Sequence, residues 1–313
     1  VYAFLHSSAA SRLTSPRTPY AILDEQDRVI AVLLGRPLDG DEQSPEQRWD
    51  VAMARLAALL EEERSRVEET FQGEMGHHRR GDYAALSFGL SYGGGQKVRF
   101  DAHTRLLERV LGTEDAQRLA GFGSDGLASY FPKAYRHHRE RMQELLDSDD
   151  LLQLPFKCSV YPTCTLNMGP RSACHDHNDC TNYSVLPCSV TVLVSFNPDE
   201  GGHFYFWDLK MVVRFPPGAT ILLSSSGLRH GNVGIKDGET RYSVTQYCVG
   251  GLVRWVSYFC VPAKLVSDDE RDRLDRERLE GWREQLSRLS FYHQLDRDRE
   301  ELLEWERSFC SRK

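Results

Sequence analysis

The sequence predicts an α+β protein in which an antiparallel β core is flanked by helices within one domain. Between residues 156 and 260, short β-branched and aromatic runs alternate with Gly, Pro, Asn and Asp turns, which is typical of an antiparallel sandwich or barrel. Segments with helical spacing lie on both sides of this stretch. The length of 313 residues, with 40% hydrophobic and 27% charged residues, suits a large globular domain rather than a disordered chain.

Residues 1–155 are expected to form a hairpin followed by helices. Two apolar runs within residues 18–35 are separated by a polar turn, which is the pattern of a hairpin. Ser44 is expected to cap the next helix, with Pro45 at the first helical position and Gln47 completing a capping box. The apolar face of this helix is Trp49, Met53, Leu56 and Leu60. Two more helices are expected over 106–119 and 127–146, the second interrupted or entered at Pro132.

Residues 156–260 are expected to form the β core, and residues 261–313 a C-terminal helical region. The expected strands are 188–196, 203–208, 211–215, 220–224, 242–247 and 253–259. Ser267 and Glu270 form a second capping box at the start of the C-terminal helices. The dense mixed charges that follow are expected to be a solvated helical face.

Composition narrows the classes of function. The net charge of −7 argues against a protein that coats nucleic acid through bulk charge, although a local basic groove remains compatible with it. No apolar stretch is long enough to cross a bilayer, so no membrane span is expected. The 8 cysteines contain no C-x-x-C pair, although five fall between residues 158 and 188. Free thiols are favoured, while an unusual zinc site or disulfide there stays open.

The segment 174–182 carries a metal-binding pattern. Residues two apart in an extended chain point the same way, so His177 and Asp179 could bind one ion from a single strand end. His230 follows the expected strand 220–224 and could be the third ligand. Two imidazoles and one carboxylate on one face are the ligand set of non-haem Fe(II) oxygenases. A pair of His175 and His177 is the alternative, but the carboxylate suits iron better.

A second feature lies at a fixed distance from His230. After ten intervening residues come Arg241 and Ser243, which a strand would place on the same face. A guanidinium binds carboxylates in bidentate fashion, so Arg241 suits the far carboxylate of 2-oxoglutarate and Ser243 adds a hydrogen bond. The combined pattern predicts a double-stranded β-helix, jelly-roll or cupin-like, with Fe(II), 2-oxoglutarate and O2. Structural histidines and an ordinary surface arginine are the alternative, but buried polar groups would then need partners.

Several longer motifs carry a resemblance to a known family. They are His175-x-His177-x-Asp179-x-x-Asn182, the run 201–210, the run 215–221, Leu228-Arg229-His230-x-Asn232, and the stretch from Gly238 to Trp255. The chain resembles the TET/JBP family of Fe(II)/2-oxoglutarate nucleobase dioxygenases, especially its fungal, transposon-associated branch. Agreement is near-continuous from about 156 to 258, with looser agreement upstream at 28–32, 91–96 and 121–122.

The resemblance implies a role for each matching residue. It implies iron ligation by His177, Asp179 and His230, and a 2-oxoglutarate clamp of Arg241 and Ser243. His203 matches another co-substrate contact, and the substrate residues are Asn182, Tyr247 and the pocket-lining Asn167. Tyr247 would stack on the base and Asn182 would hydrogen-bond to it. The chain departs from the family at Val249, where TET enzymes have a histidine that reads cytosine. The large cysteine-rich zinc domain of animal TET proteins is also absent from this sequence.

The resemblance further implies oxidation of 5-methylcytosine in DNA to 5-hydroxymethylcytosine, with further oxidation left open. The base would be flipped out of the duplex, because a methyl group inside the stack cannot reach the metal. Methylated DNA is then the partner, the location is nuclear, and a monomer without a protein partner is expected. The alternatives are an N6-methyladenine or dual-specificity dioxygenase, a protein hydroxylase, and a catalytically idle DNA-binding module. Candidate phosphate contacts are the cluster 77–80, Lys97, Arg99, Arg171 and Arg254.

Overall fold

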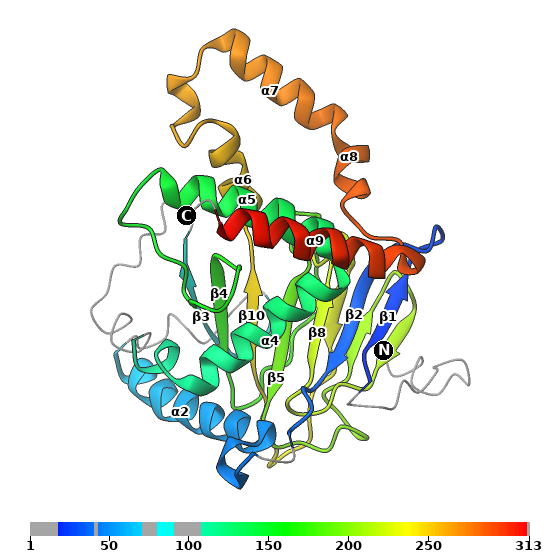
Figure 1. Cartoon of the computed structure of the whole chain (residues 1–313). Helices are drawn as coiled ribbons and strands as arrows, with labels where there is room; N and C mark the ends of the chain where they lie inside the picture. Colours follow the sequence, from blue (N-terminus) through cyan, green and yellow to red (C-terminus); the bar gives the residue numbers. More distant parts are fainter. Residues whose placement is uncertain (1–17, 41–42, 71–79, 91–107, 312–313) are drawn as a thin grey trace.

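The computed structural model describes residues 18–40, 43–70, 80–90 and 108–311, and two antiparallel sheets form its core (Figure 1). The strands of the larger sheet are β1 (Tyr20–Leu23), β2 (Val29–Gly35), β3 (Ala84–Gly89), β4 (Thr163–Met168), β5 (Cys188–Leu193), β8 (Thr220–Leu223) and β10 (Tyr242–Tyr247). Their order is β1-β2-β8-β5-β10-β4-β3. The smaller sheet has the order β7-β6-β9, from β6 (Phe204–Phe206), β7 (Met211–Val213) and β9 (His230–Asn232).

Helices cover one face of the larger sheet and one of its ends. The longer helices are α2 (Trp49–Thr70), α4 (Glu114–Tyr130), α5 (Pro132–Asp147), α6 (Gly250–Ser257), α7 (Asp268–Glu280), α8 (Trp282–Ser287) and α9 (Leu295–Cys310). Short 3-10 turns are η1 (Pro45–Gln47), η2 (Ala263–Leu265) and η3 (Tyr292–Gln294). In Figure 1, α2 and α4 lie across the sheet, while α7 and α8 rise above the other helices. This α+β arrangement is the double-stranded β-helix, or jelly roll, that the sequence predicts.

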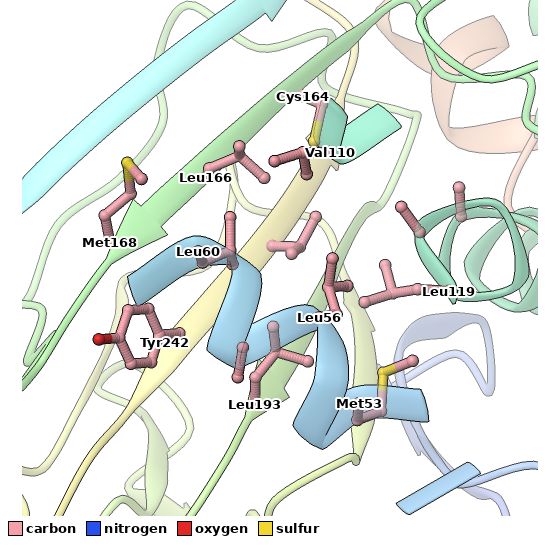
Figure 2. Packing of buried hydrophobic residues seen from close by; sticks show 14 of the residues in the cluster. Met53, Leu56, Leu60, Val110, Leu119, Cys164, Leu166, Met168, Leu193 and Tyr242 are labelled. Atoms are coloured by element: carbon pink, nitrogen blue, oxygen red, sulfur yellow. The ribbon is translucent and has the colours of Figure 1, made fainter. Parts of the chain in front are cut away.

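The alternation of side chains along β10 separates the hydrophobic core from the opposite, polar face of the sheet. Tyr242 and Val244 point toward the helices and are buried in a cluster with residues of α2, β4 and α4. Figure 2 shows two members of this cluster on α2, with Leu60 near Leu166 of β4 and Leu56 nearer to Leu119 of α4. On the other face, one end of the larger sheet packs against the smaller sheet through a second apolar cluster. The remaining part of that face is left for polar side chains.

Most of the predicted local structure is confirmed. β1 and β2 form the predicted hairpin, and the Gln47 side chain accepts a hydrogen bond of 3.1 Å from the Ser44 N–H, as in a capping box. That box caps the 3-10 turn η1, and α2 begins two residues after the end of this turn, at Trp49. Pro132 is the first residue of α5, so it starts a new helix after α4. Ser267 caps α7 through a hydrogen bond from the Glu270 N–H. All eight cysteines are free thiols.

Three expectations about the local structure were wrong in whole or in part. Residues 253–259 were expected to form a strand, but 250–257 form α6, whose buried residues Leu252, Val253 and Val256 recur at helical spacing. The expected helix 106–119 is confirmed only in part, because 108–111 and 114–119 are helical but a turn at Gly112 and Thr113 separates them, and the second part begins α4. Residues 106–107 lie outside the described residues. The core sheet also recruits β1, β2 and β3 from the part of the chain before residue 156.

Among the described helices, none combines the length and the apolar character that crossing a membrane requires.

The close packing of α4 on the sheet predicts a specific effect on stability. A Cβ added at Gly126 would overlap Cδ1 of the buried Leu34 side chain, whereas one added at Gly121 would lie 3.6 Å from the Cys158 Sγ, an ordinary contact. Gly126→Ala should therefore lower the free energy of unfolding by about 1–3 kcal/mol. The control Gly121→Ala should raise the free energy of unfolding by up to about 1 kcal/mol, because alanine has a higher helix propensity than glycine. Urea denaturation of both variants measures this, and equal effects would contradict the packing.

Candidate active site

A cavity of about 310 Å³ opens between the two sheets. Eight of the nine residues that the sequence singled out contribute to its lining, and His203 is the exception. The lining comes from β3, β4, β5 and β10 of the larger sheet, from β6 and β9 of the smaller one, and from the segment 172–182 between β4 and β5. Chain segments that are far apart in sequence therefore meet in one enclosed space.

His177 and His230 are paired through the backbone. The His177 N–H donates to the His230 carbonyl at 2.9 Å, and the His230 N–H donates back at 3.0 Å. This bridge places the two imidazole rings 4.5 Å apart between centroids. Asp179 completes the group, with Oδ1 3.5 Å from the His177 Nε2 and Oδ2 4.0 Å from the His230 Nε2. One ligand atom from each of the three residues lies within 4.8 Å of the others, so the three can hold one metal ion.

The orientation of both imidazole rings leaves Nε2 free for a metal. The His177 Nδ1 lies 2.8 Å from the His175 carbonyl oxygen, and the His230 Nδ1 lies 2.7 Å from the Leu228 carbonyl oxygen. A proton on each Nδ1 satisfies these contacts and selects the tautomer whose Nε2 carries a lone pair. Phe204 stacks on the His230 ring at 5.6 Å and fixes its plane. Each ring is therefore held in place by the protein itself.

The charges of the group suit a cation. Burial opposes ionisation of Asp179, but its hydrogen bond from His177 and the nearby Arg80 lower its pKa to about 2. Burial lowers the pKa of His230 to about 4, and the neighbouring His177 adds to this. Burial also disfavours a charged His177, yet its hydrogen bond to Asp179 raises the pKa of that ring to about 10. A divalent ion could replace the proton that His177 and Asp179 share.

Arg241 precedes β10 and is buried, with an exposed fraction of 3%. Its Nη1 donates to the Ser172 carbonyl at 2.7 Å, while its Nε finds no hydrogen-bond partner. Burial lowers the pKa of this guanidinium to about 10. Within the described part of the chain no carboxylate pairs with it, so a buried cation faces the cavity without a counter-charge. A carboxylate ligand would satisfy it.

Neighbouring polar residues extend the site along β10. Ser243 pairs in register with Asn167 of β4, whose Nδ2 donates to the Ser243 Oγ at 2.9 Å. Tyr247 lies at the far end of the strand, with its hydroxyl 3.2 Å from the Thr165 Oγ1. The Asn182 Nδ2 lies 3.2 Å from both the Cys188 Sγ and the Ser225 Oγ. These side chains give the cavity a polar floor from Arg241 to Tyr247.

Two predicted candidates lie outside the cavity lining. The His203 ring is partly buried near Arg214 and Asp199, and its contact with a co-substrate stays a prediction without support from the geometry. His175 is exposed and contributes only its backbone to the site, so the geometry favours the ligand pair His177 and Asp179 over His175 and His177.

The basic residues that were predicted to contact phosphate lie outside the cavity lining or outside the described residues, apart from Arg80. Arg171 pairs with Asp237 at 2.5 Å, and Arg254 is exposed on α6. Lys97, Arg99 and residues 77–79 lie outside the described residues.

Parts of the site were not predicted from the sequence, or were predicted with another role. Arg80, the last residue of the cluster 77–80 that was predicted to contact phosphate, instead forms an ion pair with Asp179. Tyr83 donates from its hydroxyl to the Cys174 Sγ at 3.4 Å. Cys174 lies 3.6 Å from the His177 Nδ1. No local pattern marks Tyr83, and none predicts these contacts of Arg80 and Cys174, since they form only through the tertiary fold. Thr245 could have been found, because it continues the alternation from Arg241 and Ser243.

Comparisons with known proteins give weak likenesses only. No family model and no curated protein matches the chain. Among solved structures, NgTET1 in complex with 5mC DNA matches at 15% identity over 80% of this chain and 86% of that chain, with a TM-score of 0.40. A 2OG-Fe(II) oxygenase family oxidoreductase from Burkholderia pseudomallei matches at 18% identity over 67% and 93%, with a TM-score of 0.31.

A third solved structure is the viral collagen prolyl hydroxylase vCPH from Paramecium Bursaria Chlorella virus-1 in its 2OG complex. It matches at 10% identity over 59% of this chain and 89% of that chain, with a TM-score of 0.26. All three TM-scores lie below 0.5, so the assignment of this site rests on its own geometry. By that geometry, the donor set of two imidazoles and a carboxylate fits Fe(II), and Arg241 fits a carboxylate of 2-oxoglutarate.

The two candidate ligand sets predict different effects on metal binding. Asp179→Asn should weaken Co(II) binding about 100-fold or more, because even outer partners of metal ligands are worth 10–100-fold. The control His175→Ala should bind Co(II) like the unchanged protein, since the His175 side chain is exposed outside the cavity. Titration calorimetry and the visible absorption of Co(II) measure both. A loss in His175→Ala with retention in Asp179→Asn would reverse the assignment.

Proposed function

We propose that the protein is an Fe(II)- and 2-oxoglutarate-dependent dioxygenase that oxidises the methyl group of a nucleobase in DNA, with 5-methylcytosine as the first candidate. One observation carries the proposal. The metal-ligand group of His177, Asp179 and His230 shares a cavity with Arg241, a buried guanidinium that lacks a counter-charge among the described side chains. This pairing of a facial metal site with a carboxylate clamp suits a keto-acid co-substrate.

The residues that line the cavity would have separate roles. His177, Asp179 and His230 would hold Fe(II), which together with 2-oxoglutarate and O2 supplies the oxidation of a methyl group and leaves succinate and CO2. Arg241 would bind the far carboxylate of the co-substrate, and Ser243 would donate a hydrogen bond to it. Arg241 and Tyr247 are separated by six positions, about 20 Å along a strand. The co-substrate and the base would therefore enter different ends of one cavity.

A nucleobase can reach this cavity only when it leaves the base stack. The site lies between two sheets, so a methyl group within a duplex would stay far from the metal ligands. Tyr247 offers a ring for stacking, and the Asn182 amide offers a hydrogen bond to the base edge. Nuclear methylated DNA is the corresponding partner. Asn167 holds Ser243 through its hydrogen bond and lines the same cavity.

One observation favours a second substrate. Val249 lines the cavity at the position where the TET resemblance would place a cytosine-reading histidine. Its smaller, apolar side chain leaves more room and removes a hydrogen bond specific to cytosine. N6-methyladenine is therefore the alternative base, alone or beside 5-methylcytosine.

The most direct test measures oxidised nucleosides. The iron-loaded protein, supplied with 2-oxoglutarate and O2, should convert DNA that carries both methyl marks to hydroxymethylated products detectable by mass spectrometry. The ratio of cytosine to adenine products decides the base. Succinate without an oxidised base would instead indicate a protein hydroxylase, and no succinate under any condition would indicate an idle binding module.

The carboxylate clamp can be tested separately. Arg241→Met should raise the KM for 2-oxoglutarate at least about tenfold, because a charge-assisted hydrogen bond worth about 1.5–3 kcal/mol is lost. The control Arg171→Met removes an exposed arginine that pairs with Asp237 and should leave this KM unchanged. Steady-state assays over a range of 2-oxoglutarate concentrations measure both variants. An unchanged KM in Arg241→Met would remove Arg241 from the clamp.

A further inference from the structure

A second and larger concavity lies beside the active-site cavity. It has a volume of about 1010 Å³ and is bounded by residues from 182–185, 250–257 and 282–289, with His137 and Arg141 of α5. Figure 1 shows α7 and α8 arching above α5 and α6 at this place. We call this concavity the arch groove.

The arch groove and the active-site cavity share a wall. Asn182 lines both of them. On either side of it, Thr181 lines the cavity and Tyr183 lines the groove. Likewise, Val249 lines the cavity and the next residue, Gly250, lines the groove. The Gly250 N–H donates to the Thr181 carbonyl at 2.8 Å, so the two halves of the wall are hydrogen-bonded to each other. A polymer with one unit in the cavity could therefore place its next units in the groove.

The charge of the groove suits an anion. Arg254 is exposed on α6, and among the described residues no acidic side chain pairs with it. The acids that line the groove, Glu277 and Glu284, each pair with a nearby arginine at 2.6 Å. The guanidinium of Arg254 is therefore available in a protein whose net charge is −7.

An exposed aromatic ring lies in the same groove. Trp282, the first residue of α8, is 57% exposed. Apolar side chains of Val253, Leu286 and Leu289 also line the groove, so its surface combines an aromatic ring and apolar groups with a free cation. Proteins that bind single-stranded nucleic acid use this combination, in which bases stack on aromatic rings and phosphates pair with cations.

We propose that the arch groove binds a single-stranded stretch of nucleic acid next to the target base. Trp282 stacks on a neighbouring base, and Arg254 pairs with a backbone phosphate. This inference rests on the proposed nucleobase function. An acidic peptide could also pair with Arg254, but the shared wall favours the strand, because its nucleotides are covalently linked to the base in the cavity.

The test measures the binding of a fluorescein-labelled single-stranded oligonucleotide by fluorescence anisotropy. Trp282→Ala should weaken binding at least about fivefold, as expected for the loss of one stacked base. Arg254→Gln should lower the slope of log affinity against log salt by about one, as expected for the loss of one phosphate contact. A duplex of the same sequence should bind more weakly than the single strand.

Two matched controls lie outside the groove lining. Tyr292→Ala removes a 53% exposed aromatic ring on η3, and Arg276→Gln removes an exposed arginine on α7. Both should bind the oligonucleotide like the unchanged protein. Groove variants that bind the oligonucleotide like these controls would overturn the inference. It would also be overturned if Trp282→Ala changed only the self-association of the protein, measured by sedimentation, and left oligonucleotide binding unchanged. Because binding is measured without turnover, a protein that oxidises methylated DNA but fails this test would keep its proposed function.

Discussion

The backbone bridge between His177 and His230 is the interaction on which the site depends. These residues belong to segments that are far apart in sequence, and two reciprocal hydrogen bonds place them side by side. Further hydrogen bonds hold the same loop, from the Asp179 N–H to the Ser225 carbonyl at 3.0 Å and from the His175 N–H to the Arg80 carbonyl at 2.6 Å. Through this bridge the segment 174–182 lies beside β9, the edge strand of the smaller sheet. The smaller sheet forms one side of the cavity. The metal-ligand group is thus a consequence of how the smaller sheet pairs.

The interior of the cavity carries a cost in stability that a bound ligand would relieve. A buried guanidinium without a counter-charge and buried polar atoms without partners are unfavourable in a folded protein. Arg241 remains buried because β10, which it precedes, is packed between β4 and β5 and covered by α2 and α4 on its other face. The apolar cluster in Figure 2 offsets the cost of the polar face behind it. A carboxylate ligand would supply the missing partner.

The end of β10 connects the catalytic cavity with the arch groove. After Tyr247 the chain turns into α6, where the turn contributes Val249 to the cavity and the helix contributes Arg254 to the groove. The residues proposed to bind the target base and those proposed to bind its neighbours are thus close together in the chain as well as in space.

Local periodicity in the sequence was enough to predict part of the site. An alternation of two residues put His177 beside Asp179 and Arg241 beside Ser243, and helical spacing predicted the buried face of α2. Contacts between distant segments were decided by the tertiary structure alone. These include the approach of Arg80 to Asp179, the position of His203 outside the cavity, and the helix α6 in place of a strand. Local patterns report which way a side chain points, whereas its neighbours depend on how distant segments pair and pack.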